Sequence, residues 1–234
     1  MTRRVLVLED EESIRSFIVI NLRQAGYSVL EAATGKEALE LIKSNPDVYV
    51  TICDVMLPDM DGFEVCRRIR AMGLGTGIVM LTALSQEINK ITGLSAGADD
   101  YVTKPFSILE LVARVEALCR RVSGGLGTED TSINGNILRS GEYVLNIATR
   151  ELCKNGVKID LTQVEFLLMK AFLSNKTRAL SREELLEIVW GMDYPGEIKV
   201  VDVNIRRLRL KIEEDAANPK HITTIWGFGY RWDA

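Results

Sequence analysis

The chain has 234 residues and a formal net charge of −4, with 47% hydrophobic and 26% charged residues. This composition is ordinary for a globular protein, and no apolar run approaches the about 20 residues that span a bilayer, so a membrane-embedded protein is excluded. Residues 1–122 carry 14 Lys and Arg against 17 Asp and Glu, and residues 123–234 carry 15 against 16. Neither half is globally basic, so a nucleic-acid-binding surface must be a local patch.

The four cysteines and the single histidine argue against a disulfide framework and a zinc site. The cysteines are Cys53, Cys66, Cys119 and Cys153, and none of their spacings is CxxC. One histidine, His221, cannot supply a site with two histidines. We interpret the cysteines as small core residues. The acids at positions 9–12 cut short any signal-like hydrophobic region, so we expect a cytoplasmic protein without membrane insertion.

Strand-like and helix-like segments alternate through the first half of the chain. The apolar runs that predict strands are Arg4–Leu8, Tyr27–Ala32, Val48–Cys53, Ile78–Thr82 and Asp100–Thr103. The periodic segments that predict helices are Ser13–Gln24, Lys36–Ile42, Phe63–Arg70, Gln86–Ser95 and Ile108–Arg121. This alternation implies βαβ units, so we predict a doubly wound α/β domain with a parallel sheet over residues 1–122.

A composition shift separates the two halves. Residues 123–132 lack periodicity and are rich in Gly, Ser and Thr, which predicts a flexible linker. The rest of the chain, residues 133–234, has a different pattern and predicts a second domain of the α+β class.

Short strands and three helices are expected in this second domain. The strand candidates are Ile133–Leu138, Tyr143–Asn146, Glu151–Lys154 and Val157–Leu161, with Asn155-Gly156 predicting a type I′ turn between the last two. The helices begin after Thr162, after Ser181 and near Lys199, the first two with capping-box spacing to Glu165 and Glu184. A closing hairpin of Ile222–Ile225 and Tyr230–Trp232 completes the pattern of a winged helix-turn-helix.

Polar residues suited to phosphoryl chemistry stand at the ends of four predicted strands. In chain order they are Glu9, Asp10, Asp54, Thr82 and Lys104. The carboxyl ends of parallel strands share one edge of a sheet, so these side chains are expected to converge there. A single acid after a strand is more often a helix cap or a solvated residue. The ordered set favours a Mg²⁺ site with Asp54 as nucleophile, because Mg²⁺ removes the repulsion among the carboxylates.

The predicted last helix carries a local excess of positive charge. Its charged residues are Lys199, Asp202, Arg206, Arg207, Arg209 and Lys211, a local charge of +4. At helical spacing the apolar stripe is formed by Val201, Ile205, Leu208 and Ile212. The opposite side presents Lys199, Val203, Arg206 and Leu210, with Arg207 nearby. A solvated basic face explains an isolated helix of this kind, but the adjacent hairpin favours insertion into a DNA major groove.

The motifs resemble those of two-component response regulators of the OmpR/PhoB family, over almost the whole chain. The receiver-like motifs are residues 7–11 (VLEDE), 54–62 (DVMLPDMDG), 81–83 (LTA) and 97–106 (GADDYVTKPF). The effector-like motifs are residues 161–166 (LTQVEF), 181–186 (SREELL), 201–209 (VDVNIRRLR) and 226–231 (WGFGYR). The resemblance implies a flavodoxin-like (βα)5 receiver domain followed by a winged-helix DNA-binding domain.

The resemblance also implies roles for matching residues of the receiver. Asp54 would accept a phosphoryl group from a sensor histidine kinase. Mg²⁺ would be bound by Asp10, Asp54 and the backbone carbonyl of Met56, with Glu9 acting through water. Lys104 would contact the phosphate, with a cis bond to Pro105, and Thr82 and Tyr101 would form a switch pair.

Phosphorylation would then produce a homodimer on DNA. The matching dimer pairs are Lys90 with Glu110 and Asp100 with Arg114, while a third falls at Ser95 and Glu116, which cannot form a salt bridge. The expected DNA contacts are Lys199, Val203, Asn204, Arg206, Arg207, Arg209, Lys211, Thr224 and Trp226. Trp226 stands where some relatives carry an arginine that contacts the minor groove, so we expect minor-groove readout to be weaker or absent. RNA polymerase is a further candidate partner.

Three functions therefore compete. The leading hypothesis is a phosphorylation-switched transcriptional regulator, with no enzymatic activity beyond phosphoryl acceptance and slow self-dephosphorylation. A phosphatase with Asp54 as nucleophile explains the acids and Lys104, but Met56 stands where a general acid would be expected, and the basic helix stays unexplained. The third hypothesis is a DNA-binding regulator whose receiver dimerises independently of phosphorylation.

Overall fold

In the computed structural model, the described residues are 3–82, 96–122, 136–192 and 194–233, with the side chains of 120–122 left out. Contacts divide the chain into two units, Met1–Gly125 and Leu126–Ala234. The predicted linker at 123–132 lies outside the described residues, so its bounds stay a prediction. Within the described part, no helix is both long enough and apolar enough to cross a membrane.

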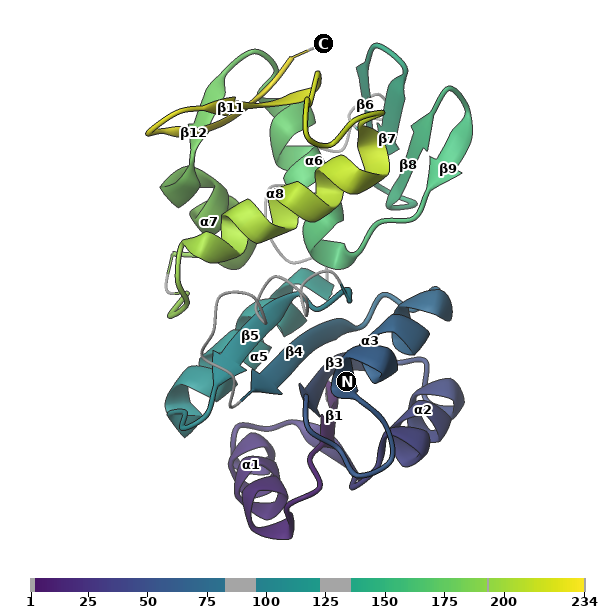
Figure 1. Cartoon of the computed structure of the whole chain (residues 1–234), viewed down its shortest axis with the longest axis vertical. Helices are drawn as coiled ribbons and strands as arrows, with labels where there is room; N and C mark the ends of the chain where they lie inside the picture. The colour runs from purple at the N-terminus through teal and green to yellow at the C-terminus, as the bar shows by residue number, and fades with distance from the viewer. Residues whose placement is uncertain (1–2, 83–95, 123–135, 193, 234) are drawn as a thin grey trace. The chain divides into compact units, whose positions relative to one another are not determined.

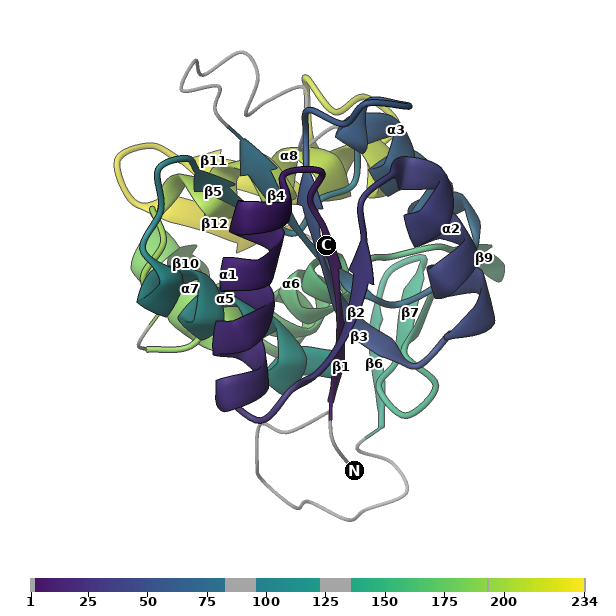
Figure 2. The same ribbon diagram turned by 90° about the horizontal axis from the view of Figure 1, so that it is seen from below.

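The first unit is a parallel sheet covered by helices on both faces. Its elements are β1 (Arg4–Leu8), α1 (Glu12–Gln24), β2 (Ser28–Ala32), α2 (Gly35–Ser44), β3 (Val48–Asp54), α3 (Gly62–Ala71), β4 (Gly77–Thr82), β5 (Asp100–Thr103) and α5 (Ile108–Val122). The strand order is β2-β1-β3-β4-β5, and all neighbours run parallel. Helices α1 and α5 lie on one face, and α2 and α3 lie on the other (Figures 1 and 2). The doubly wound prediction is confirmed.

The strands of this unit are apolar runs because both faces of the sheet are covered. Residues 5–8 of β1 and 78–81 of β4 are fully buried, as parallel strands under two helical layers require. The strand order reverses between β1 and β3, and a crevice at the carboxyl ends of such strands is the usual ligand site of this architecture. The helix predicted over Gln86–Ser95 lies outside the described residues.

The second unit contains two antiparallel sheets and three helices. Its elements are β6 (Ile137–Ser140), β7 (Tyr143–Asn146), β8 (Glu151–Lys154), β9 (Val157–Ile159), α6 (Gln163–Ser174), β10 (Ala179–Ser181), α7 (Arg182–Trp190), α8 (Lys199–Ile212), β11 (Ile222–Ile225) and β12 (Gly229–Trp232). The sheets have the orders β6-β7-β8-β9 and β10-β12-β11. This is the predicted winged-helix arrangement.

Local signals in the second half of the sequence are borne out in detail. Both capping boxes form, Thr162 with Glu165 at α6 and Ser181 with Glu184 at α7. Asn155 and Gly156 both have positive φ, as the type I′ turn requires. The strand expected over Ile133–Leu138 instead occupies Ile137–Ser140 within the described residues.

Strand β10 was not predicted. Its three residues, Ala179–Ser181, are too few for a visible alternation, and the local sequence pattern at Ser181 indicates only a helix cap. The strand forms because β12 supplies its partner, with Leu180 opposite Tyr230. The two backbones approach closely at Gly229, where an added Cβ would lie 2.1 Å from the Leu180 carbonyl oxygen.

Gly62 at the start of α3 offers a test of the close packing beside β3. A Cβ at this position would lie 2.0 Å from the Asp54 carbonyl oxygen, which is backbone and cannot move aside alone. We expect Gly62→Ala to destabilise the unit by about 1–3 kcal/mol, measured by urea denaturation. Gly75→Ala is the matched control, because its Cβ meets nothing within 4 Å. Equal stability of the two variants would contradict this packing.

Candidate phosphoacceptor and DNA-binding sites

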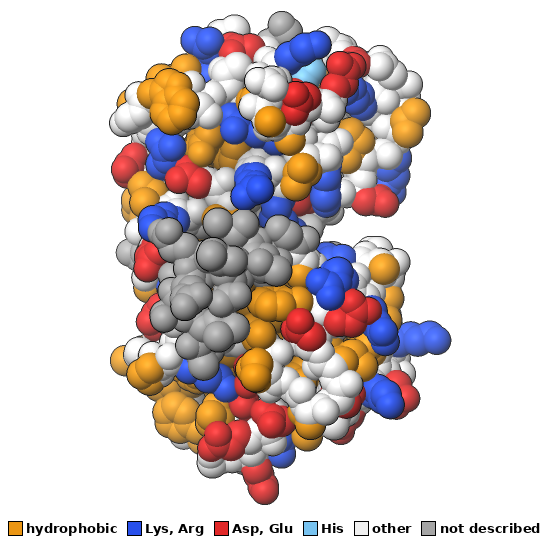
Figure 3. Space-filling model, viewed as in Figure 1, with side chains coloured by type: hydrophobic (Ala, Val, Ile, Leu, Met, Phe, Trp, Pro, Cys, Tyr) orange, Lys and Arg blue, Asp and Glu red, His pale blue; other side chains and the backbone are white. Residues whose placement is uncertain are grey.

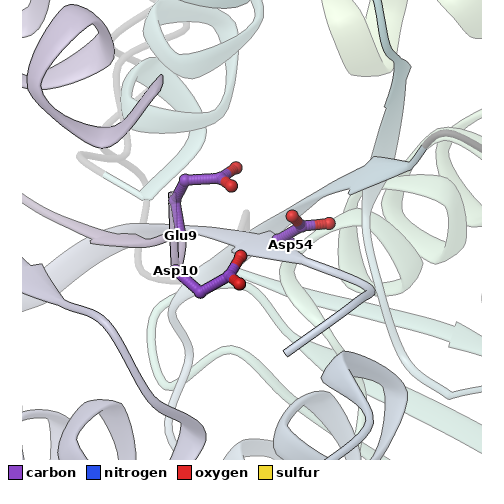
Figure 4. A group of neighbouring side chains, drawn as sticks. All are labelled: Glu9, Asp10 and Asp54. Carbon is purple, nitrogen blue, oxygen red and sulfur yellow. The ribbon is translucent and has the colours of Figure 1, made fainter. Parts of the chain in front are cut away.

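Three carboxylates meet at the carboxyl ends of β1 and β3. Glu9 and Asp10 directly follow β1, and Asp54 is the last residue of β3. One oxygen from each lies within 4.8 Å of the others, and Figure 4 shows the three side chains as one group. Glu9 and Asp54 are buried, while Asp10 is exposed. The topology therefore brings the predicted acids together at a site that solvent reaches through Asp10.

Lys104 joins two of these carboxylates. Its Nζ donates hydrogen bonds to Glu9 Oε2 at 2.8 Å and to Asp54 Oδ2 at 2.7 Å. The residue follows β5, and its backbone amide donates to the Thr82 carbonyl oxygen at 2.7 Å. The Lys104–Pro105 bond is cis, as expected. One ammonium thus offsets the repulsion between two acids that are distant from it in sequence.

Burial shifts the pKa of Glu9 and opposes the charge on Lys104. Burial raises the pKa of Glu9 to about 7, and the charge of Asp54 adds to this rise against the hydrogen bond from Lys104. Burial also opposes the charge on Lys104, but its hydrogen bonds to Asp54 and Glu9 outweigh this, and its pKa is raised. The lysine is therefore a cation throughout the physiological range, and Glu9 is poised to change charge near neutrality.

The donor set fits a hard divalent cation. Mg²⁺ takes oxygen ligands and binds through one or two carboxylates with waters and phosphate oxygens. Glu9 Oε1 is buried and has no hydrogen-bond partner among the described residues, so one oxygen remains available for a cation or its water. Met56 follows two residues after Asp54, and its amide donates to Asp54 Oδ1 at 3.2 Å. This contact shows that the Met56 backbone lies beside Asp54 in the structure.

The expected switch residues lie on adjacent strands. Thr82 ends β4, is buried, and stands opposite Thr103 of β5. Tyr101 precedes Thr103 by two residues, so the two side chains share one face of the sheet. Tyr101 packs against the apolar core, and its hydroxyl oxygen is buried. Thr82 follows Leu81, the residue opposite Asp54, and so lies at the same strand edge as the acids. Tyr101 lies two residues before Thr103, the residue opposite Thr82, on the same face of the sheet.

Arg114 has its predicted dimer partner within its own chain. The guanidinium binds Asp100 at 2.9 Å and Glu110 at 2.5 Å. If Arg114 bound Asp100 of a second copy in a dimer, that contact would either replace these internal ion pairs or add to them. Lys90 and Ser95, which were expected at the same face, lie outside the described residues.

Helix α8 of the second unit presents part of the expected basic face. Lys199 and Arg206 are exposed, Val203 is half-buried, and Leu210 is exposed. Figure 3 shows basic and hydrophobic side chains together over this helix, and hydrophobic ones at the tip of the β11–β12 hairpin. Trp226 in that hairpin is 91% exposed. Lys199, Arg206 and the wing residue Trp226 are therefore accessible, and Val203 is partly so.

Asn204 and Arg207, both among the expected DNA contacts, lie on the inner side of α8. Asn204 is fully buried and its amide donates to the Val200 carbonyl oxygen at 2.9 Å. Arg207 is 7% exposed, donates to Asn204 Oδ1 at 3.3 Å, and lies 3.6 Å from Glu165 of α6. The buried carboxylate of Glu165 holds the arginine on the inner flank of α8. Neither side chain is therefore placed to contact DNA.

Lys211 and Arg209 also have partners within the domain. Lys211 Nζ binds Glu165 Oε2 at 2.6 Å. Arg209 donates to the Ile222 carbonyl oxygen and, at 2.9 Å, to Thr224 Oγ1. The sequence did contain a signal for this arrangement. Glu165 occupies the capping-box position of an apolar helix, which indicates a buried acid, and a buried acid needs cationic partners.

A cluster that sequence reasoning missed joins α7, α8 and the hairpin. Asp202 Oδ1 accepts hydrogen bonds from Arg182 Nε at 2.8 Å and from the Tyr230 hydroxyl at 2.6 Å. The Tyr230 ring lies beneath the guanidinium groups of Arg182 and Arg209, at 5.1 and 5.4 Å from its centroid. This cluster fixes α8 relative to the hairpin. It also neutralises Asp202, the acid of the basic helix.

Comparisons with known proteins identify a domain family in each of the two units. Residues 5–116 match the response regulator receiver domain family, and residues 156–232 match the C-terminal domain of transcriptional regulatory proteins. The sensory transduction protein RegX3 of Mycolicibacterium smegmatis is 40% identical over 228 residues, 97% of each chain. RegX3 of Mycobacterium tuberculosis strain H37Rv has the same identity and coverage.

The chain is a response regulator of the OmpR/PhoB family. Among solved structures, the Thermotoga maritima OmpR/PhoB homologue DrrB is 32% identical over 100% of both chains with a TM-score of 0.51. A mutant of RitR is 25% identical over 99% of both chains with a TM-score of 0.77. The acids described above therefore belong to a receiver domain and α8 to a DNA-binding domain, which is consistent with phosphorylation-dependent regulation.

The raised pKa of Glu9 predicts a pH dependence of receiver stability without metal. Between its ordinary value of 4.5 and about 7, the unfolded chain has lost this proton while the folded chain retains it. The free energy of unfolding therefore falls as pH rises through this window, by up to about 1.4 kcal/mol per pH unit for one proton.

Glu9→Gln removes this titration, so the difference in unfolding free energy between wild type and variant should fall from pH 4.5 to 7. Urea denaturation in EDTA at several pH values measures it. A difference that stays constant with pH would show that the carboxyl titrates normally.

Proposed function

We propose that Asp54 accepts a phosphoryl group from the histidine of a sensor kinase and that this event controls promoter binding by α8. The supporting observation is the bridge of Lys104 between Asp54 and Glu9, inside a cluster of three carboxylates. A lysine ammonium that bridges two carboxylates can bind phosphoryl oxygens in their place, because both groups are anionic oxygen acceptors. The same chain carries a basic helix with an outward face, so the input and the output are both present.

The transfer itself moves one phosphoryl group between two side chains. An Asp54 carboxylate oxygen attacks phosphorus, the bond from phosphorus to the kinase imidazole nitrogen breaks, and the imidazole retains the electron pair. Bound Mg²⁺ would neutralise charge on the phosphoryl oxygens. Asp10, Asp54 and the Met56 carbonyl would hold it, with Glu9 acting through water. Lys104 would leave its carboxylate partner for a phosphoryl oxygen, which stabilises the charge there.

The signal would pass from the acids to the face beyond β5. Thr82 would hydrogen-bond the phosphoryl group, and Tyr101 on the same sheet face, whose hydroxyl is already buried in this structure, would be held in that inward position. The internal ion pairs of Arg114 with Asp100 and Glu110 lie at the proposed dimer face. Their rearrangement would favour a homodimer, with Lys90 as a further partner of Glu110. Two basic helices would then bind tandem DNA half-sites, and RNA polymerase is the proposed later partner.

The proposed DNA contacts follow the accessible side chains. Arg206 would pair with a base edge in the major groove, Val203 would contact a thymine methyl group, and Lys199 would bind a phosphate. Trp226 at the hairpin tip would approach the adjacent minor groove. Arg209, Lys211 and Thr224 would act mainly through their partners in the domain, which fix α8 and the hairpin.

A small phosphodonor tests the phosphoacceptor. With acetyl phosphate and Mg²⁺, wild type should gain one phosphoryl group by mass spectrometry, and hydroxylamine should remove it because the product is an acyl phosphate. Asp54→Asn should gain none. Lys104→Met should be phosphorylated much more slowly, because the Lys104 cation is absent from the transition state. Unchanged labelling of Asp54→Asn would assign phosphorylation to another residue.

Arg206 and Lys211 separate the outward face of α8 from its flank. On a site selected from a random DNA pool, Arg206→Ala should weaken binding by about 1–3 kcal/mol and relax base preference at one position. Lys211→Met should act mainly on stability, because Lys211 is bound to Glu165. Fluorescence anisotropy with a melting curve for each variant measures both effects. Equal loss of affinity in two folded variants would contradict the assignment of faces.

A further inference from the structure

The loop between β3 and α3 carries Met56 and is fixed at both ends. At its start, the Val55 amide donates to the Leu81 carbonyl oxygen at 3.0 Å. At its end, the Gly62 amide donates to the Val55 carbonyl oxygen at 2.9 Å, and Asp61 caps α3 through the Phe63 amide at 2.9 Å. These contacts close the loop at its base. None of these contacts involves the middle of the loop, residues 57–60, so the position of that part depends on a further contact.

Asp59 supplies that contact from the middle of the loop. Its Oδ1 accepts a hydrogen bond from the Gly35 amide at 2.8 Å, and its Oδ2 accepts one from the Lys36 amide at 3.0 Å. Both amides belong to the first turn of α2, where backbone donors have no partner in the helix and a negative charge is favoured. Although burial opposes it, the two amide hydrogen bonds lower the pKa of Asp59. The carboxylate is thus a charged clamp between two elements.

Helix α2 is a firm anchor for this clamp. Its inner side chains Ala38 and Ile42 are fully buried in the receiver core. Thr34 caps the same helix independently, by accepting a hydrogen bond from the Glu37 amide. The loop also fits closely here, because a Cβ on Gly35 would lie 2.6 Å from Met60 Cγ. The position of the loop is therefore set against α2 by one charged residue and one tight packing contact.

We propose that Asp59 is a positioning residue for Mg²⁺, which holds the loop so that the Met56 backbone stays beside Asp54. The inference rests on the proposed binding of Mg²⁺ by Asp10, Asp54 and the Met56 carbonyl. Asp59 does not touch the ion. It acts as residues behind metal ligands commonly do, by fixing the ligand that the ion needs, and loss of such residues typically weakens binding about 10- to 100-fold.

Asp59→Asn tests this role with little change in shape. The amide nitrogen of Asn would face one of the two N–H donors, so only one hydrogen bond to α2 can remain. Isothermal titration of the full chain with MgCl2 should give a Kd about tenfold weaker than that of wild type. With acetyl phosphate, the Mg²⁺ concentration for half-maximal rate should rise, and the maximal rate at saturating Mg²⁺ should return to the wild-type value.

Two control variants separate positioning from stability and from charge. Thr34→Ala removes the other cap of α2 and leaves the loop clamp, so it reports the effect of a weaker helix. Glu37→Gln removes one negative charge from the same exposed turn and leaves Asp59 in place. Both should bind Mg²⁺ within about twofold of wild type, since neither changes a group that fixes a ligand. The Asp59→Asn loss should also persist in 0.5 M NaCl, where charge effects over more than about 5 Å are screened.

The outcomes are distinct. Wild-type affinity in Asp59→Asn, with normal binding by the wild type, overturns the positioning role and leaves the proposed function intact. A loss shared equally with Thr34→Ala or Glu37→Gln also overturns it, in favour of helix stability or charge. Failure of the wild-type protein to bind Mg²⁺ or to be phosphorylated overturns both proposals together.

Discussion

The repulsion among Glu9, Asp10 and Asp54 is the constraint on which the receiver site depends. Their carboxylates lie within 4.8 Å of one another, two of them buried, and Lys104 Nζ within 2.8 Å offsets the charge on two. This arrangement requires a parallel sheet, because residues from β1, β3 and β5 meet only at a shared strand edge. The charges also suit exchange of partners. A cation can replace Lys104 as the partner of the carboxylates, and a phosphoryl group can replace the carboxylates as the partner of Lys104.

The DNA-binding domain also uses two acids to hold cations, the buried Glu165 and the partly exposed Asp202, and these ion pairs position α8. Glu165 holds Arg207 and Lys211, and Asp202 holds Arg182 with the Tyr230 hydroxyl. These contacts engage two cations of α8, Arg207 and Lys211, with α6, and connect α8 through Asp202 to α7 and the hairpin. The exposed cations Lys199 and Arg206 therefore project from a helix whose position in the domain is fixed. Local charge alone therefore overstates how many basic residues are available to DNA.

Sequence predicted well the features that depend on short-range pattern and chain order. The strands of the receiver, the capping boxes and the Asn155-Gly156 turn follow from local periodicity and turn chemistry. Convergence of Glu9, Asp54 and Lys104 followed from parallel topology. The inner placement of Arg207 did not follow, because it depends on a buried acid in another helix. The three residues of β10 and the clamp of Asp59 on α2 depend likewise on partners distant in sequence.

The central claim is that the state of Asp54 determines whether α8 occupies DNA. The direct measurement is quantitative footprinting of a selected site by wild type and Asp54→Asn, each with and without acetyl phosphate and Mg²⁺. The account predicts that the donor raises occupancy by wild type at limiting protein concentration and leaves Asp54→Asn unchanged. Equal occupancy by wild type with and without the donor, once labelling of Asp54 is verified, would contradict it.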